Sequence, residues 1–295
     1  MKNIIYNYYG LLIYDIKECN NNYYFNYNDE MYLICTVLNN IEIVIDTYEY
    51  CLKNKLDCFK IVKNNNNEFF SKVNDKVYVL LKVKGILNYE YNVFDFNKLI
   101  IDKTGQNWGS LWANRLDYYE IQLRELGIKY QTVLNTFGLF KGIAENAILY
   151  FNMSIKRFKD NVIVGIEHNR IKYPCFLIDY NNPINFVIDY SVRDISEYIK
   201  SYMLSDSYSL DYVIEILNSF NFNKLMFNIL YSRLLYPSFY FDIFDNIILE
   251  DGKDNDVIYV VNNYNKYIKM LKEIYFIFKD KYEMFKIEWL DKIKM

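Results

Sequence analysis

The chain has 295 residues, of which 52% are hydrophobic, 24% charged and 19% aromatic. That length suits one large domain or two modest ones with a full hydrophobic core, which excludes a disordered chain. The 34 Lys and Arg residues against 37 Asp and Glu residues give a net charge of −3, so the basic surplus that a nucleic-acid groove requires is absent.

Residues 1–84 are predicted to form a β-rich region with one helix. The expected strands are residues 11–16, 23–27, 31–37, 59–62, 69–73 and 77–83. Asn28 and Asp29 signal a hairpin turn, and residues 69–73 are expected to pair only as a hairpin arm. Apolar residues at positions 41, 45, 48 and 52 recur at helical spacing, with Asn39 or Asn40 as the cap.

Residues 85–295 are predicted to be mainly helical around short strands. The expected helices are residues 111–126, 132–151, 195–203 and 210–217, one that ends before Pro237, and one from about residue 264 to the end. The expected strands are residues 162–166, 176–178 and 186–188. Ser191 and Ser209 are predicted N-caps. Gly138 and Gly142 are expected to let two helices touch.

This order of elements predicts an α+β fold with a two-lobed, protein-kinase-like layout. A small antiparallel β lobe with one helix, residues 1–84, precedes a larger mainly helical lobe, residues 85–295, and the hinge is expected near residues 81–87. Because many α+β chains share such an order, function has to be argued from individual residues.

The small lobe lacks two parts that phosphoryl transfer needs in this fold. A glycine-rich loop covers the phosphates and a Lys on the third strand pairs with them. No glycine occurs between Gly10 and Gly85, and residues 31–37 contain neither Lys nor Arg. The phosphate cradle and its counter-ion are therefore both missing.

The larger lobe keeps a partial trace of a catalytic loop. His168-Asn169-Arg170 follows an apolar run, and Asp189 follows about twenty residues later, as in the HxD loop and metal-binding triplet of small-molecule kinases. Arg170 stands where the catalytic Asp would be, and Cys175 where a metal-binding Asn would be. An Arg cannot accept a proton at neutral pH, so no residue is assigned as catalytic.

Two interpretations stay open for Asp189, and one is favoured for His168. Asp189 could hold Mg²⁺ if a nucleotide binds, or it could pair with Arg193. His168 has no Asp partner nearby in the sequence, which favours a structural role. The five cysteines form no CxxC pair and suit buried thiols in a reducing compartment.

Neither a signal peptide nor a membrane span is predicted. The expected location is therefore the cytoplasm.

Four segments resemble the CotS/YutH group of spore coat-associated proteins. They are IDYSVRDISEYIK at residues 188–200, LLYPSFYFD at 234–242, the W-x3-W-x2-R-x-DYYE pattern at 108–120, and GIAENAI at 142–148. That group is similar in turn to aminoglycoside phosphotransferases and choline kinases. The resemblance implies a kinase-like fold used in sporulation and coat assembly, with degenerate nucleotide machinery, and it implies other coat or sporulation proteins as partners and the spore coat as a second location.

The leading hypothesis is a degenerate, pseudokinase-like protein that acts by binding and needs no cofactor. The alternative is an active small-molecule phosphotransferase that uses ATP and Mg²⁺ at Asp189. A third is a structural protein retained in a lineage that no longer makes spores.

Overall fold

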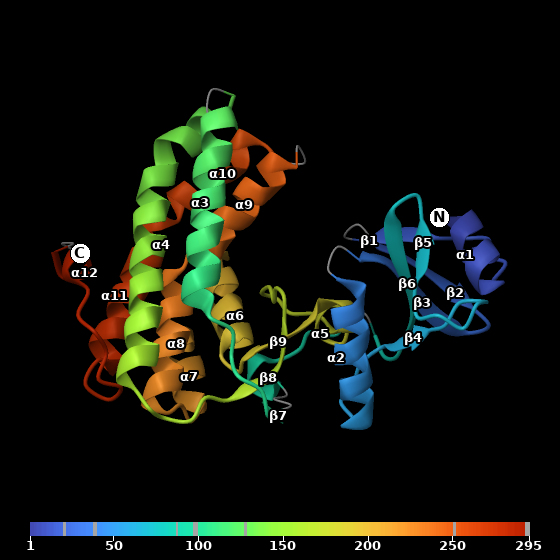
Figure 1. Cartoon of the computed structure of the whole chain (residues 1–295), viewed down its shortest axis with the longest axis horizontal. Helices are drawn as coiled ribbons and strands as arrows, with labels where there is room; N and C mark the ends of the chain where they lie inside the picture. Colours follow the sequence, from blue (N-terminus) through green and yellow to red (C-terminus); the bar gives the residue numbers. More distant parts are fainter. Residues whose placement is uncertain are drawn as a thin grey trace. The chain divides into compact units, whose positions relative to one another are not determined.

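The computed structural model describes residues 1–19, 22–37, 40–86, 88–96, 100–126, 129–249 and 252–292 (Figure 1). The chain divides into two compact units. The first comprises Met1–Asn92, Ile166–Asn169 and Pro174–Ile188, and the second Val93–Gly165, Arg170–Tyr173 and Asp189–Met295. This division differs from a single cut after residue 84, because two later segments belong to the first unit.

A six-stranded antiparallel sheet forms the centre of the first unit, in the order β1-β2-β3-β6-β4 with β5 also paired to β6. The strands are β1 (Lys17–Cys19), β2 (Asn22–Tyr27), β3 (Glu30–Val37), β4 (Lys60–Val62), β5 (Ser71–Val73) and β6 (Lys76–Val83). The predicted hairpin turn between β2 and β3 is confirmed. Asn28 and Asp29 have φ of 51° and 60°, as a two-residue turn between twisted strands requires.

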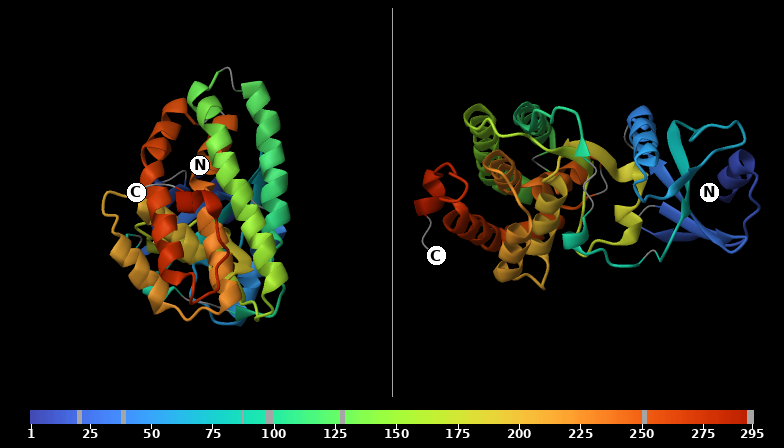
Figure 2. Two further views of the ribbon diagram at one scale, coloured as in Figure 1. Left: turned by 90° about the vertical axis from the view of Figure 1, so that its left-hand side faces the viewer. Right: turned by 90° about the horizontal axis from the view of Figure 1, so that it is seen from below.

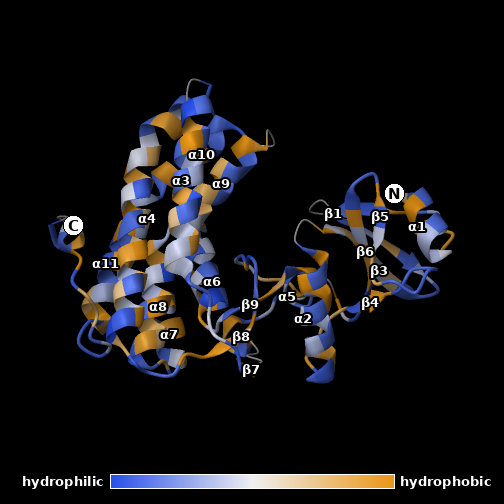
Figure 3. Cartoon of the chain, viewed as in Figure 1, coloured by the Kyte–Doolittle hydropathy of each residue, from blue (hydrophilic) through white to orange (hydrophobic). Residues whose placement is uncertain are grey.

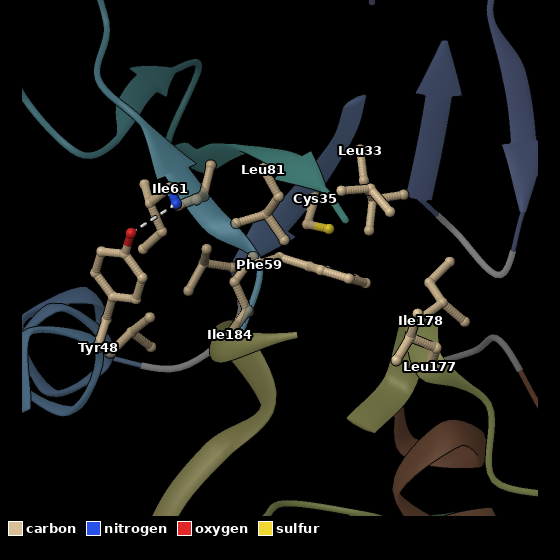
Figure 4. Close-up of a cluster of buried hydrophobic side chains, with 13 residues drawn as sticks. Leu33, Cys35, Tyr48, Phe59, Ile61, Leu81, Leu177, Ile178 and Ile184 are labelled. Carbon is tan, nitrogen blue, oxygen red and sulfur yellow. Dashed lines mark hydrogen bonds between the residues drawn. The ribbon is translucent and has the colours of Figure 1, made fainter. Parts of the chain in front are cut away.

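Helices cover both faces of this sheet, because side chains alternate along each strand. One face packs on the helix α1 (Lys2–Tyr9), with Ile5, Phe25 and Ile34 in a shared core. The opposite face packs on the helix α2 (Ile41–Lys53), the short helix α5 (Leu177–Tyr180) and the 3₁₀ turn η2 (Pro183–Asn185) (Figure 4). The predicted cap of α2 is confirmed, since the Asn40 side chain accepts a hydrogen bond from Glu42 N at 2.9 Å.

The second unit is mainly helical. Its helices are α3 (Trp108–Leu126), α4 (Gln131–Arg157), α6 (Arg193–Leu204), α7 (Leu210–Ser219), α8 (Lys224–Leu235), α9 (Ser238–Ile248), α10 (Asp254–Asn262), α11 (Tyr264–Phe278) and α12 (Glu288–Lys292); a 3₁₀ turn η1 (Val93–Asp95) precedes them. Every described residue of α8 from Leu225 to Leu235 is buried, which makes α8 the central helix. It packs against α4 and α6.

A three-stranded sheet lies in the order β7-β8-β9, formed by β7 (Ile100–Ile101), β8 (Val164–His168) and β9 (Phe186–Tyr190). The chain passes between the units within β8, after Gly165, and within β9, after Ile188. Asp189 is therefore the first residue of β9 that belongs to the second unit.

Three of the predicted helices and strands differ from the structure. Residues 11–16 form no strand, because Gly10 ends α1 with a φ of 67° and the following chain packs Ile13 against the α1 face of the sheet without pairing. Residues 177–180 form the helix α5 where a strand was expected. The last long helix ends at Phe278, and Glu283 has a φ of 49°, which no α-helix accommodates.

The glycine pair on α4 does not mediate a helix contact in the part of the chain described. α3 and α4 run side by side (Figures 1 and 2). A Cβ atom placed on Gly138 or Gly142 would have no neighbour within 4 Å. Both helices carry hydrophobic residues among their polar ones (Figure 3), and Leu139 and Leu149 are exposed.

Among the described residues, no helix is long and apolar enough to cross a membrane.

We expect Tyr48→Phe to lower the free energy of unfolding by about 1–3 kcal/mol, because the backbone N–H of Ile61, which donates to the Tyr48 hydroxyl at 3.0 Å, would be left buried without an acceptor. Urea denaturation measures this loss. Tyr50→Phe in the same helix is the matched control, and equal losses in the two variants would contradict the prediction.

Candidate functional site

Asp189 lies at the centre of a buried network of charged side chains in the second unit. Its carboxylate is 0% exposed. Oδ1 accepts hydrogen bonds from Trp108 Nε1 at 2.7 Å and from the backbone N of Tyr190 at 2.8 Å. Oδ2 accepts from Arg193 Nη1 at 2.9 Å and lies 3.1 Å from Arg233 Nη1. Three hydrogen bonds and one further ion pair, with Arg233, therefore engage both oxygens.

Trp108, the first residue of α3, contacts Asp189, Arg193 and Arg233. Its indole N–H donates to Asp189, while its ring faces the guanidinium groups of Arg193 at 5.1 Å and Arg233 at 4.6 Å. A cation over an aromatic face is stabilised further when both are shielded from water. The indole thus ties α3 to β9, α6 and α8.

Glu197 of α6 forms a second acidic centre beside Asp189. Its Oε1 accepts a hydrogen bond from Lys200 Nζ at 2.9 Å, and its Oε2 accepts one from Ser238 Oγ at 3.0 Å. Lys200 Nζ also donates to Ser238 Oγ at 2.6 Å. Arg233 Nη2 lies 3.9 Å from Glu197 Oε1, so Arg233 connects Glu197 to Asp189.

Arg170 joins the same network from the loop after β8. It donates from Nε and Nη2 to the two carboxylate oxygens of Asp242 in α9, at 2.7 and 2.6 Å. Its Nε also lies 3.9 Å from Glu197 Oε2. This two-point contact with a carboxylate is the strongest geometry available to Arg.

Three further residues of the 108–120 pattern, Trp112, Arg115 and Tyr119, pack next to the network, where Trp112 faces the guanidinium group of Arg233. Trp112 stacks on Tyr236 with ring centroids 4.5 Å apart. Arg115 donates to the Tyr119 hydroxyl at 2.6 Å and pairs with Asp245, which also accepts a hydrogen bond from that hydroxyl at 2.9 Å. Three of the four segments that carry the family resemblance thus converge on one place.

Burial and neighbouring charges shift the ionisation of these groups in different directions. Burial lowers the pKa of Arg233, although Asp189 opposes the shift. Burial also lowers the pKa of Lys200, to about 8, against the attraction of Glu197. Burial alone would raise the pKa of Glu197, but the neighbouring cations, chiefly Lys200 and Arg170, outweigh it and hold that pKa below 4.5. Glu197 is therefore ionised at neutral pH.

The four residues that the sequence singled out belong to two different units. Arg170 and Asp189 meet in the network through Glu197 and Arg233. His168 and Cys175 belong to the first unit. His168 is buried, with Nε2 2.7 Å from the carbonyl oxygen of Tyr180, which supports the structural interpretation. Cys175 is 1% exposed.

Asp189 does not fit the magnesium site of a kinase. A Mg²⁺ ion bound to either oxygen would lie next to the guanidinium groups of Arg193 and Arg233 and would have to displace established donors. Among the described residues, no group of three or more His, Cys, Asp or Glu side chains could hold a metal ion. Of the two interpretations of Asp189, the geometry supports pairing with Arg193.

Sequence reasoning missed Glu197, Lys200, Arg233 and Asp242 as members of a site. A signal existed for Arg233, because it is the only charged residue between positions 225 and 235 of an otherwise mostly apolar helix, and a buried charge needs a partner. The other three lie in segments that the sequence marked only as family features. Which charges pair could not be predicted, since the partners lie up to 72 residues apart.

We expect Asp189→Asn to destabilise the protein by about 3–5 kcal/mol, since it leaves two buried guanidinium groups without their counter-charge. Urea denaturation at pH 7 gives the loss. Asp206→Asn, in an exposed turn, is the control. A loss at Asp189 no larger than the control's would show that the network does not stabilise the fold.

We expect Glu197→Gln to make stability less dependent on pH in acid. Because the pKa of Glu197 lies below 4.5 in the folded state, its ionised form stabilises the fold above that pH, and the contribution is lost as the pH falls. Between about pH 5 and pH 3, the unfolding free energy of the variant should fall less steeply than that of the wild type. If the unfolding free energies of the variant and the wild type fall in parallel with pH, the prediction is contradicted. Glu215→Gln, which changes an exposed carboxylate, is the control.

Comparison with solved structures identifies the fold. The chain is similar to an aminoglycoside phosphotransferase from Alicyclobacillus acidocaldarius, with a TM-score of 0.57 and 11% identity over 93% of this chain and 94% of that chain. It is also similar to a spectinomycin phosphotransferase in complex with ADP and spectinomycin, with a TM-score of 0.46 and 11% identity over 92% of each chain. At 11% identity the likeness to the first of these structures shows the fold alone, and it confirms the predicted α+β, protein-kinase-like fold class.

Comparison of sequences identifies the family. No curated protein matches the chain. A family model described as "Spore coat putative kinase YutH" matches residues 2–275, nearly the whole length. The segments that suggested the CotS/YutH resemblance lie inside this match and supply most of the buried network. The chain belongs to the YutH family of spore coat proteins.

Proposed function

We propose that this protein acts in the spore coat by binding other coat or sporulation proteins and does not transfer phosphate. The observation that carries the proposal is the packing of the sheet face in the first unit that holds α2. Leu33 and Cys35 of β3 point into a core that Leu177, Ile178 and Ile184 close from the other side (Figure 4). The chain's own side chains occupy that face.

Cys35 supports the proposal most directly. An active kinase needs a Lys on its third strand to pair with the nucleotide phosphates. Cys35, in the middle of β3, is 2% exposed, and burial raises the pKa of its thiol to about 12, so it carries no charge. The Asn182 amide lies 3.9 Å from its sulfur. An apolar core therefore takes the place of a phosphate counter-ion.

Close packing at the end of β6 gives further support. A Cβ atom on Gly85 would lie 2.8 Å from Leu177 Cδ2, and Gly85 has a φ of 100°. The helix α5 thus lies directly against the end of the strand. Binding of a planar base at this face would require α5 to move away and expose the apolar residues that it now covers.

The network in the second unit leaves no group suited to activate an acceptor hydroxyl. Arg170, at the position of the catalytic Asp, is held by both oxygens of Asp242 and cannot accept a proton. Asp189 accepts three hydrogen bonds and also forms an ion pair with Arg233. These charges are arranged to stabilise the helical unit. A rigid unit of this kind suits a protein that presents a surface to partners.

Wild-type protein should gain no thermal stability from ATP and Mg²⁺ at millimolar concentrations. A ligand at a hundred times its dissociation constant would add about 2.7 kcal/mol, which differential scanning fluorimetry detects readily. A clear stabilisation that disappears in Asp189→Ala would contradict the proposal and favour an ATP-dependent phosphotransferase. Because each variant is compared with and without nucleotide, its lower intrinsic stability does not confuse the result.

A fluorescent fusion, expressed in a sporulating bacterium whose own family member has been deleted, should collect at the surface of the developing spore. Time-lapse microscopy follows the signal, and the fluorescent protein alone is the control. A fusion that stays diffuse throughout sporulation would count against a coat role. Asp242→Asn, which removes the partner of Arg170, should still localise if it remains folded, since coat binding does not use that pair.

A further inference from the structure

A second feature of the first unit has no part in the proposed function. A hollow of about 930 Å³ opens at the end of the sheet where the β2–β3 turn meets the end of β6. Its lining comes from residues 26–31, from Cys58 and Lys60 at the start of β4, and from residues 82–85. We refer to it as the lysine hollow, because Lys60, Lys82 and Lys84 all line it.

The positive charge of the lysine hollow is only partly neutralised. Lys82 pairs with Glu30, and Lys84 lies 3.4 Å from Asp57, where both side chains are largely exposed. Exposed pairs of this kind contribute little. Lys60 forms no ion pair with any residue that the structure describes. The lining also carries the carboxylates of Asp29 and Glu30, so its three lysines exceed its acidic residues by one, in a chain whose net charge is negative.

Strand pairing places two of these lysines next to each other, and Glu30 pairs with only one of them. Lys60 of β4 and Lys82 of β6 are direct partners in the antiparallel register, so their side chains leave the same face side by side. Like charges directly opposite each other destabilise a sheet. An anion placed between them would turn this repulsion into attraction for both.

The chemistry of the lining selects the kind of anion. Lysine ammonium groups act as compact point charges and suit the tetrahedral oxygens of a phosphate, whereas paired recognition of a flat carboxylate favours Arg, which the lining lacks. The amides of Asn26 and Asn28 line the hollow as further donors. Met31 and Val83 add apolar surface, which suits the carbon skeleton of a small molecule.

We propose that the lysine hollow binds a small soluble phosphomonoester, with Lys60 and Lys82 as the charged contacts to the phosphate. This site consists of residues of the first unit alone and lies outside the Leu33–Leu177 core and the Asp189 network. The proposed phosphate site can therefore be tested independently of the proposed function.

Isothermal titration with glycerol 3-phosphate tests the proposal on the full chain. Wild-type protein should bind it saturably, with an affinity at least about tenfold higher than for sulfate and weakening as salt is added. Lys60→Gln should reduce the affinity at least about tenfold, as expected for a charged hydrogen bond. Lys76→Gln, at the other end of β6, should leave it within twofold. No saturable binding, or equal losses in the two variants, would overturn the proposal.

Two further arms make the result specific. Without ligand, Lys60→Gln should melt at a temperature equal to or above that of the wild type, because it removes the repulsion from Lys82; a clearly lower melting temperature would assign Lys60 a structural role and overturn the proposal. Vesicles that contain phosphatidic acid present the same phosphate chemistry on a lipid. Binding to the vesicles without binding to glycerol 3-phosphate would overturn the assignment to a soluble ligand.

Discussion

The buried carboxylate of Asp189 is the interaction on which the second unit depends. Two guanidinium groups, an indole N–H and a backbone N–H converge on it from β9 and from three helices. A buried charge without a partner destabilises a protein strongly, so the helices that carry these groups have to pack around Asp189 at the same time. The lone pairs of this carboxylate accept hydrogen bonds from α3, β9 and α6 in the structure.

Packing or pairing also engages the other residues that the sequence singled out, and Cys35 in the middle of β3. Arg170 is paired with Asp242 and holds the loop after β8 against α9. Cys35 fills the middle of β3 with an uncharged side chain in an apolar core. His168 packs against Tyr180 and Phe186. Each of these side chains is used in a packing or pairing contact within its own unit.

Predictions from sequence succeeded where the physical signal was local. The β2–β3 hairpin followed from Asn28-Asp29, and α2 followed from helical spacing with an Asn cap. They failed where tertiary packing decided. The apolar run at residues 11–16 has a strand-like pattern, yet its side chains are used to cover a sheet face. Ser191 has the composition of a cap, but α6 begins at Arg193 without a side-chain cap. Arg193, the first residue of α6, is instead paired with Asp189.

The sequence by itself determined which residue types are present: no glycine between Gly10 and Gly85, no Lys or Arg in residues 31–37, and Arg at position 170. Residue identity suffices there, because these statements concern positions in the chain and not contacts between them. Only the tertiary structure decided what the remaining groups do. The sequence left Asp189 open to metal or to arginine, and its contacts with Arg233 and Trp108, which lie far away in the chain, form only when the helices pack.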